Sequence, residues 1–220
     1  MKLYIIPTPI GNLEDITFRA IRLLKEVDII FCEDTRTTKN LLTHYEIEKK
    51  CYAYHINNEH KQVENYVSMI KNAQAAALVS DAGTPGISDP GYLFIRACLA
   101  SGIEIECLPG ATALIPALVA SGFPCEKFYF HGFLPHKKGK ESILRMFAER
   151  KETVVFYESP HRIIKTLSLM LSIFYPETMI CVSREISKIY EEHFRGTISE
   201  ALVHFTPKEV KGEIVVTISA

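Results

Sequence analysis

The chain has 220 residues, of which 47% are hydrophobic and 23% are charged. These values are typical of globular proteins and exclude a disordered, collagen-like or coiled-coil architecture. Lys plus Arg number 25 and Asp plus Glu 26, so the net charge of −1 does not by itself indicate a nucleic-acid binder. No apolar run approaches the roughly 18 residues of a membrane span, and the N-terminal apolar stretch is too short for a secretory signal. We therefore expect a soluble, cytoplasmic protein with no membrane association.

The cysteines do not form a recognisable framework, because none belongs to a C-x-x-C pair. Most lie in apolar stretches, which favours buried, reduced thiols over disulfides or a zinc site. The spacing of His55, Glu59 and His60 matches no zinc motif, so we expect a solvated, partly helical loop there and no bound metal. The six cysteines are Cys32, Cys51, Cys98, Cys107, Cys125 and Cys181.

The first half of the chain alternates short apolar runs with helical patterns. This β-α-β rhythm predicts an α/β fold with an open, mostly parallel sheet. The predicted strands cover residues 2–6, 28–32, 76–80 and 103–108, and the helices cover 16–27 and 92–100.

The second half has more strands and fewer helices. Two strands lie close together near its end, which indicates some antiparallel pairing and a mixed sheet. We place an N-terminal domain at residues 1–115 and a C-terminal domain at 116–220. The predicted strands are 128–133, 153–157, 179–184, 193–197 and 213–218, with helices chiefly at 140–150 and 161–174.

Three turns rich in glycine and proline follow predicted strands, at residues 7–12, 80–91 and 109–113. If the strands are parallel, the turns lie at one edge of the sheet, where open α/β sheets bind ligands. Glycine allows a ligand to approach the backbone and proline stiffens the loop. The glycine spacing in 80–91 does not match G-x-G-x-x-G, and Tyr92 stands where a P-loop has lysine. A purely structural loop is the alternative interpretation.

Two charged clusters also follow strands. Glu33, Asp34 and Arg36 follow the second strand, although Asp34 or Thr35 could simply cap the next helix. The second cluster is the segment 157–162, whose polar residues could likewise simply cap the next helix.

In that second cluster, Ser159 and Pro160 could begin a helix as its N-cap and first residue. Glu158, His161 and Arg162 would then lie near the helix N-terminus, and His161 could exchange protons near neutral pH. A Ser–His hydrolase has little support, because there is no G-x-S-x-G elbow. The basic segment 136–140 could contact phosphate or be an ordinary surface loop, and the mixed-charge run 184–192 is typical of a solvated face.

Taken together, these segments resemble the tetrapyrrole methylase superfamily and, within it, the ribosomal RNA small-subunit methyltransferase I family. The resemblance covers nearly the whole chain, and the segments 80–91 and 157–162 are the most specific part of it. The matching segments are 8–13, 15–17, 33–36, 80–91, 109–110, 132–135, 156–162, 184–185, 195–196 and 211–214.

The resemblance implies a two-domain α/β protein that binds S-adenosyl-L-methionine in a cleft between its domains and forms a homodimer. It implies methylation of the ribose 2′-hydroxyl of a cytidine, in small-subunit ribosomal RNA or in the assembled small ribosomal subunit. The implied cofactor residues are Pro9, Ile10, Gly83, Thr84, Pro85, Ile87, Ser88, Thr112, Ala113, Tyr157, Glu158 and Gly212.

The reaction would also need a base to take the hydroxyl proton and cations to orient phosphate. The sequence leaves the choice of base open. The candidate bases are Glu33, Asp34, Asp81, Glu158 and His161, and the candidate phosphate ligands are Arg36, Arg162 and Arg184.

Two features bear on the alternatives. Porphyrin-modifying members carry Gly-Asp-Pro where this chain has Thr84 between Gly83 and Pro85, which weighs against a porphyrin-like substrate. Longer members of the family carry a C-terminal extension, expected to help hold RNA, that the 220-residue sequence lacks. One alternative is a methyltransferase acting on a porphyrin-like or other small molecule, and the other is a non-catalytic ribosome-binding module.

Overall fold

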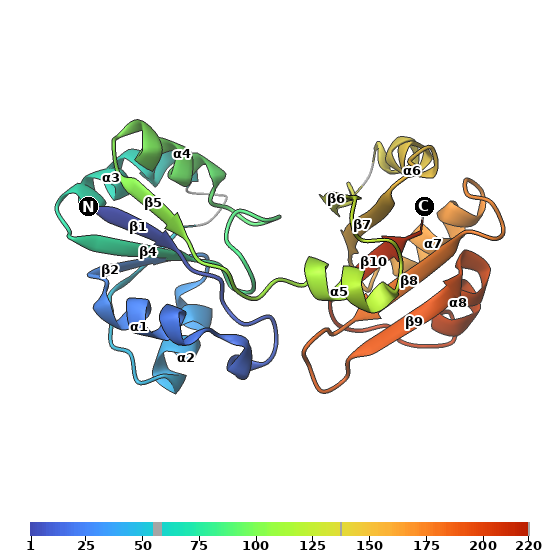
Figure 1. The fold of residues 1–220 in the computed structure, drawn as a ribbon, viewed down its shortest axis with the longest axis horizontal. Helices are drawn as coiled ribbons and strands as arrows, with labels where there is room; N and C mark the ends of the chain where they lie inside the picture. The colour runs from blue at the N-terminus through green and yellow to red at the C-terminus, as the bar shows by residue number, and fades with distance from the viewer. Residues whose placement is uncertain (55–58, 137, 220) are drawn as a thin grey trace. The chain divides into compact units, whose positions relative to one another are not determined.

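The computed structural model describes residues 1–54, 59–136 and 138–219. The chain divides into two compact units, residues 1–112 and 113–220, each with its own sheet and core (Figure 1). The division falls three residues before the boundary that we placed from the sequence, and it leaves the first helix of the second unit whole.

The first unit is built on a five-stranded sheet in which every strand pair is parallel, as the β-α-β rhythm predicts. The strand order is β3-β2-β4-β1-β5. The strand β3 was not predicted, because its three partly buried residues are too few to show a periodicity. The strands are β1 (Lys2–Ile5), β2 (Ile29–Cys32), β3 (Cys51–Ala53), β4 (Ala75–Val79) and β5 (Glu104–Cys107).

Helices cover both faces of this sheet (Figure 1). α1 (Phe18–Glu26) and α2 (Thr35–His44) pack on one face, and α3 (Glu59–Lys71) and α4 (Tyr92–Ala100) pack on the other. The α1 helix shows why these segments form helices that pack on the sheet. Thr17 caps its N-terminus, and apolar side chains at helical spacing face the sheet. These buried side chains are Ala20, Leu23 and Leu24.

The second unit has a mixed five-stranded sheet of order β6-β7-β10-β8-β9, which confirms the mixed sheet that we predicted. Only the β6–β7 pair is parallel, and the other pairs are antiparallel. All five residues of the central strand β10 are buried. The strands are β6 (Phe128–Phe133), β7 (Thr153–Glu158), β8 (Met179–Arg184), β9 (Glu192–Thr197) and β10 (Ile214–Ile218).

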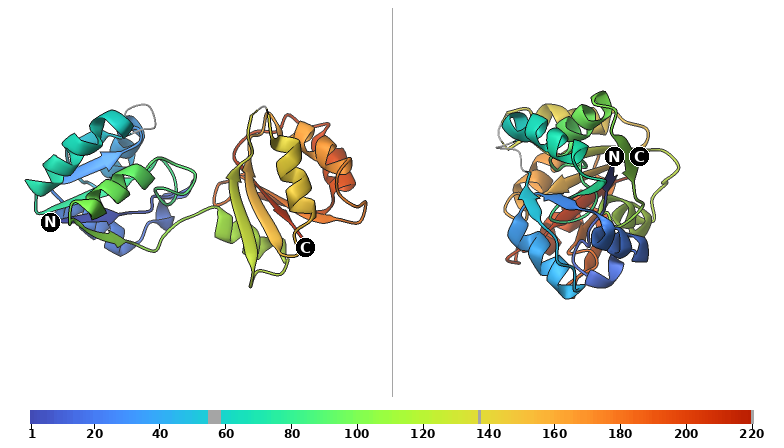
Figure 2. Two further views of the ribbon diagram at one scale, coloured as in Figure 1. Left: turned by 90° about the horizontal axis from the view of Figure 1, so that it is seen from above. Right: turned by 90° about the vertical axis from the view of Figure 1, so that its left-hand side faces the viewer.

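Three helices of this unit contribute to one core, α6 (Lys140–Ala148), α7 (Ile163–Leu171) and α8 (Ile198–Phe205). A fourth helix, α5 (Leu114–Ser121), packs on the opposite face of the sheet, against four of its five strands, β7 to β10 (Figure 2). The helix α8 was not predicted, although Thr197 and Glu200 form a capping box at its start.

The start of α7 differs from the sequence-based expectation. Ser159 and Pro160 do not act as N-cap and first residue, because the helix begins at Ile163 after a turn. That turn is closed by hydrogen bonds from the N–H groups of Arg162 and Ile163 to the Ser159 carbonyl, at 2.9 and 3.0 Å.

All six cysteines are unpaired, and Cys32, Cys98 and Cys181 are buried. The expectation of burial is wrong for Cys107 and Cys125, which are exposed because they lie on an edge strand and in a loop. Within the described ranges, no three His, Cys, Asp or Glu side chains gather as a metal site, and no helix is long and apolar enough to cross a membrane. His55 and the side chains of Glu59 and His60 lie outside what the structure describes.

Candidate functional site

The three glycine-rich turns meet at the carboxyl edge of the first sheet, as their positions after parallel strands predict. Thr8 and Gly83 exchange two backbone hydrogen bonds of 2.9 Å and so join the first turn to the second. The Thr84 hydroxyl donates to the Ala111 carbonyl at 3.2 Å and joins the second turn to the third. Gly110 packs so closely on Pro7 that a Cβ added to it would lie 2.7 Å from the proline Cβ.

Gly83 occupies the centre of this meeting point. Its φ of +79° is left-handed, a region that favours glycine. A Cβ at Gly83 would lie 3.5 Å from Ile10 Cγ2, 3.7 Å from the Ala111 carbonyl oxygen and 4.0 Å from Thr112 Cα. The absence of a side chain therefore keeps the space between these residues open. Three of the residues assigned to the cofactor from the sequence, Ile10, Gly83 and Thr112, thus come together, and their arrangement fits close approach of a ligand.

The rest of the second turn is more exposed. Pro85 is buried, whereas Ile87 and Ser88 are exposed, and Ser88 has a left-handed φ of +64°. Such backbone strain is found preferentially at binding sites. Pro9 is half-buried beside the first turn.

The acidic cluster lies at the ends of two neighbouring strands, β2 and β4. Asp34 caps α2, as one interpretation of the sequence predicted, by accepting a hydrogen bond from the Arg36 N–H at 2.8 Å. Its carboxylate also pairs with the Arg36 guanidinium at 2.6 Å, and these contacts hold the pKa of Asp34 at about 2. Asp81 Oδ1 accepts a hydrogen bond of 3.0 Å from the Asp34 N–H. Glu33 is half-buried next to this cluster.

Asp81 differs from Asp34 in its electrostatics. Desolvation of its carboxyl raises the pKa of Asp81. The hydrogen bond from Asp34 N–H opposes this rise, and the negative charge of the Asp34 carboxylate adds to it. A carboxylate with a raised pKa is a stronger base than one held at about 2.

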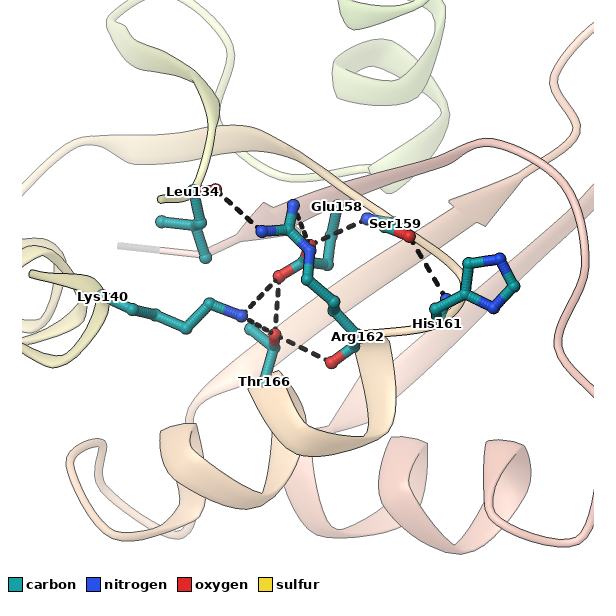
Figure 3. A network of polar contacts seen from close by, with 7 residues as sticks. All are labelled: Leu134, Lys140, Glu158, Ser159, His161, Arg162 and Thr166. Carbon is teal, nitrogen blue, oxygen red and sulfur yellow. Dashed lines mark hydrogen bonds and ion pairs between the residues drawn. The ribbon is translucent and has the colours of Figure 1, made fainter. Parts of the chain in front are cut away.

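Glu158, at the end of β7, is the centre of a polar network in the second unit (Figure 3). Its carboxylate is buried and forms ion pairs with Lys140 at 2.8 Å and with Arg162 at 2.7 Å. It also accepts hydrogen bonds from the Thr166 hydroxyl at 2.6 Å and from the Ser159 N–H at 2.8 Å. Four donors therefore occupy the lone pairs of this carboxylate.

Arg162 and His161, which follow Glu158 closely in the chain, are placed differently. Arg162 is held in place, since it also donates to the Leu134 carbonyl at 3.0 Å. The His161 ring is exposed and points away from the network (Figure 3). Lys140 was predicted only as the end of a basic segment and the start of a helix, and Thr166 was not predicted to have a role, because only the fold brings either residue to Glu158.

Tyr157 and Gly212 are two further residues of the second unit that the resemblance assigned to the cofactor. The Tyr157 ring contacts those of Phe130 and Phe133, with centroids 5.1 and 5.3 Å apart. Gly212 has a φ of +87°, and a Cβ there would overlap the Glu185 side chain.

Comparison with known proteins identifies the family. The model of the family described as "Tetrapyrrole (Corrin/Porphyrin) Methylases" matches residues 2–202. Over 218 residues the chain is 44% identical to a protein of Thermotoga maritima named ribosomal RNA small subunit methyltransferase I, and the match covers 99% of this chain and 98% of that protein. The chain belongs to the ribosomal RNA small subunit methyltransferase I family of the tetrapyrrole methylases.

Two other relatives with the same name have a similar identity to this chain and also match nearly all of it. That of Hydrogenobaculum sp. is 46% identical and matched over 96% of its length, with 100% of this chain covered. That of Bacillus subtilis is 46% identical and matched over 74% of its length, with 98% of this chain covered.

Solved structures of other methyltransferases share the fold at low identity. A cobalt precorrin-4 methyltransferase superposes with a TM-score of 0.74 at 16% identity, covering 99% of this chain and 94% of that one. A uroporphyrin-III C-methyltransferase from Thermus thermophilus, complexed with S-adenyl homocysteine, superposes with a TM-score of 0.68 at 20% identity, covering 100% and 97%.

Proposed function

We propose that this protein transfers a methyl group from S-adenosyl-L-methionine to the ribose 2′-hydroxyl of a cytidine in small-subunit ribosomal RNA. The observation that carries this proposal is the match, over almost the full length of both chains, to relatives named for small-subunit ribosomal RNA methylation. The convergence of three glycine-rich turns on Gly83 supports a small-molecule site in the same chain. We further propose that the protein acts in the cytoplasm as a homodimer.

The turns of the first unit would hold the cofactor. When bound, S-adenosyl-L-methionine supplies a methyl group on a sulfonium; the methyl carbon–sulfur bond breaks as the oxygen–methyl bond forms, and S-adenosylhomocysteine leaves as a neutral thioether. Gly83 would let the cofactor approach the backbone, and the exposed Ile87 would offer it an apolar contact. The proposed cofactor residues of these turns are Pro9, Ile10, Gly83, Thr84, Pro85, Ile87, Ser88, Thr112 and Ala113.

Asp81 is our choice for the general base that takes the hydroxyl proton. The Asp34 carboxylate is bound to Arg36 and has a pKa of about 2, which makes it a weak base. The Glu158 carboxylate is buried and its lone pairs are occupied by four donors, so we assign it to holding Lys140 and Arg162 in place. The exposed His161 ring points away from the network around Glu158 (Figure 3).

Arg36 is our choice for contact with RNA phosphate. Its side chain is 89% exposed, whereas those of Arg162 and Arg184 are 16% and 20% exposed. Arg162 and Arg184 are also bound to carboxylates and to backbone carbonyls within their own unit. An exposed guanidinium can bind phosphate with paired hydrogen bonds.

The proposal is tested with labelled S-adenosyl-L-methionine and small ribosomal subunits that lack their own decoding-region methylation. Naked ribosomal RNA and a porphyrinogen serve as parallel acceptors. We expect label in the subunits or the RNA, at a ribose 2′-oxygen of a cytidine. Label only in the porphyrinogen would favour the small-molecule alternative. Cofactor binding without transfer to any acceptor would favour the non-catalytic ribosome-binding module.

A further inference from the structure

A cavity of about 230 Å³ lies beside Asp81, wholly within the first unit. Its walls come from three segments of the chain. Thr8 and Leu13 line it from the first turn and the short helix after it, Thr37 and Asn40 from the first two turns of α2, and Asp81 from the second glycine-rich turn. Thr8, Leu13, Thr37 and Asn40 have no role in the proposed function, whereas Pro9, which also lines the cavity, is one of the proposed cofactor residues.

Hydrogen bonds tie the three walls to one another. The Tyr45 hydroxyl, just after α2, donates to the Leu13 carbonyl at 2.6 Å. The Thr8 hydroxyl donates to the Ser80 carbonyl at 3.0 Å and so joins the first wall to the third. The Asp34 N–H bond to Asp81 joins the second wall to the third. A cavity fixed on all three sides binds its ligand with little ordering cost, because its shape exists before binding.

The lining chemistry selects the class of ligand. Among the lining residues that the structure describes, Asp81 carries the only ionisable side chain, and hydroxyls and an amide supply most of the remaining polar groups. A phosphate would be repelled by a negative carboxylate, whereas a neutral sugar can both donate to and accept from hydroxyl and amide groups. The volume lies below the range of roughly 300–1,000 Å³ for drug-sized ligands, which suits a pentose and excludes a tetrapyrrole ring.

We propose that this cavity receives the acceptor ribose of the RNA, with Thr37 and Asn40 hydrogen-bonding to the sugar beside the Asp81 carboxylate. The inference rests on the proposed function and deepens it, because it names the residues that select a ribose. Arg36 immediately precedes Thr37 on α2 and its side chain is 89% exposed, so it can meet a phosphate attached to the sugar outside the cavity.

The test fills the cavity or removes one of its hydroxyls. Asn40→Phe introduces a ring into the space, and Thr43→Phe introduces the same ring on the same helix at an exposed position outside the lining. Thr37→Val removes a hydroxyl with little change of shape, and Thr43→Val is its matched control. For each variant the kcat and KM for methylation of small subunits, the binding of S-adenosylhomocysteine and the thermal melting temperature are measured.

We expect Asn40→Phe to lower kcat/KM for the subunits by about tenfold or more, and Thr37→Val by about fivefold, the loss expected for one hydrogen bond. Both should bind S-adenosylhomocysteine as the wild type does, and both controls should stay within about twofold in kcat/KM. If Asn40→Phe does not fold, Thr37→Val still decides the question.

Three results would overturn the inference. If the wild type methylates ribose while Asn40→Phe and Thr37→Val match their controls, the ribose pocket is wrong and the proposed function stands. If the variants lose S-adenosylhomocysteine binding, the cavity belongs to the cofactor. If the wild type leaves ribose unlabelled, the proposed function fails and this inference fails with it.

Discussion

The backbone N–H of Asp34 donates a hydrogen bond of 3.0 Å to Asp81 Oδ1, although the two residues are 47 positions apart in the chain. Asp34 follows β2 and Asp81 follows β4, and these strands are neighbours in the parallel sheet. The bond fixes one oxygen of Asp81. It also places Asp81 beside the start of α2, where Arg36 is exposed.

Asp81→Asn tests the assignment of the base. Asparagine keeps an oxygen that can accept the Asp34 N–H but cannot take a proton from a hydroxyl. We expect kcat for methyl transfer to fall by about 10²-fold or more, the range for losing a general base. Cofactor binding and melting temperature should change little. Asp28→Asn is the matched control, because Asp28 also accepts backbone N–H groups but lies before β2, at the opposite edge of the sheet.

The pH dependence of the same reaction gives an independent check. The base works only when ionised, so the wild-type rate should fall as the pH falls through the pKa of Asp81. Desolvation raises this pKa, which moves the acid limb above the usual aspartate value of about 3.9. The limb should be absent from the residual activity of Asp81→Asn. A variant profile that retains it would assign the limb to another group.

Glu158→Gln should destabilise the second unit. The substitution removes the negative charge and leaves the largely buried Lys140 and Arg162 cations without their counter-charge. Breaking one side of a buried ion pair costs about 3–5 kcal/mol. The free energy of unfolding in urea measures the loss.

Glu141→Gln is the control for this experiment, since Glu141 pairs with Arg145 at 2.8 Å but both side chains are 58% exposed. Its cost should stay below about 1 kcal/mol. Equal losses in the two variants would mean that burial of the Glu158 network does not contribute to stability.

Gly212→Ala separates steric overlap from backbone strain. Gly212 and Gly102 both have left-handed φ values, +87° and +74°, but only at Gly212 would a Cβ overlap another residue, the Glu185 side chain. Glu185 cannot move away freely, because it binds Lys188 and the Glu213 N–H. We expect Gly102→Ala to cost about 1–2 kcal/mol for φ alone and Gly212→Ala to cost more.

Calorimetric melting of the two variants measures this difference. Adding Glu185→Ala should reduce the cost of Gly212→Ala, because it removes the overlapping atoms. A double variant with no recovery would trace the cost to the backbone alone.

Arg36→Ala tests the proposed phosphate contact. If Arg36 neutralises one phosphate, the dependence of log K on log salt concentration for subunit binding should weaken by about 0.7–0.9. Arg22→Ala is the matched control, since Arg22 is also exposed and paired with a nearby carboxylate. Binding measured across a salt series compares them. The same slope for both variants and the wild type would remove Arg36 from the RNA contact.

Much of the fold follows from local sequence patterns. The strands β1, β2, β4 and β5 and the helix α1 show their apolar patterns directly in the sequence, and Thr17 marks where α1 begins. β3 was missed because it is short, and α7 begins later than predicted because a turn over residues 159–162 competes with the helix. The capping box at Thr197 shows that α8 could have been predicted from the sequence.

The sequence by itself determined where ligand-binding turns could occur, because glycine and proline act on the backbone at their own positions and parallel strands end at one edge. The tertiary structure alone decided which side chains meet there. Asp34 reaches Asp81, Lys140 and Thr166 reach Glu158, and α2 closes the cavity against the first turn. Such contacts depend on the three-dimensional register of strands and helices far apart in the chain, which no local periodicity records.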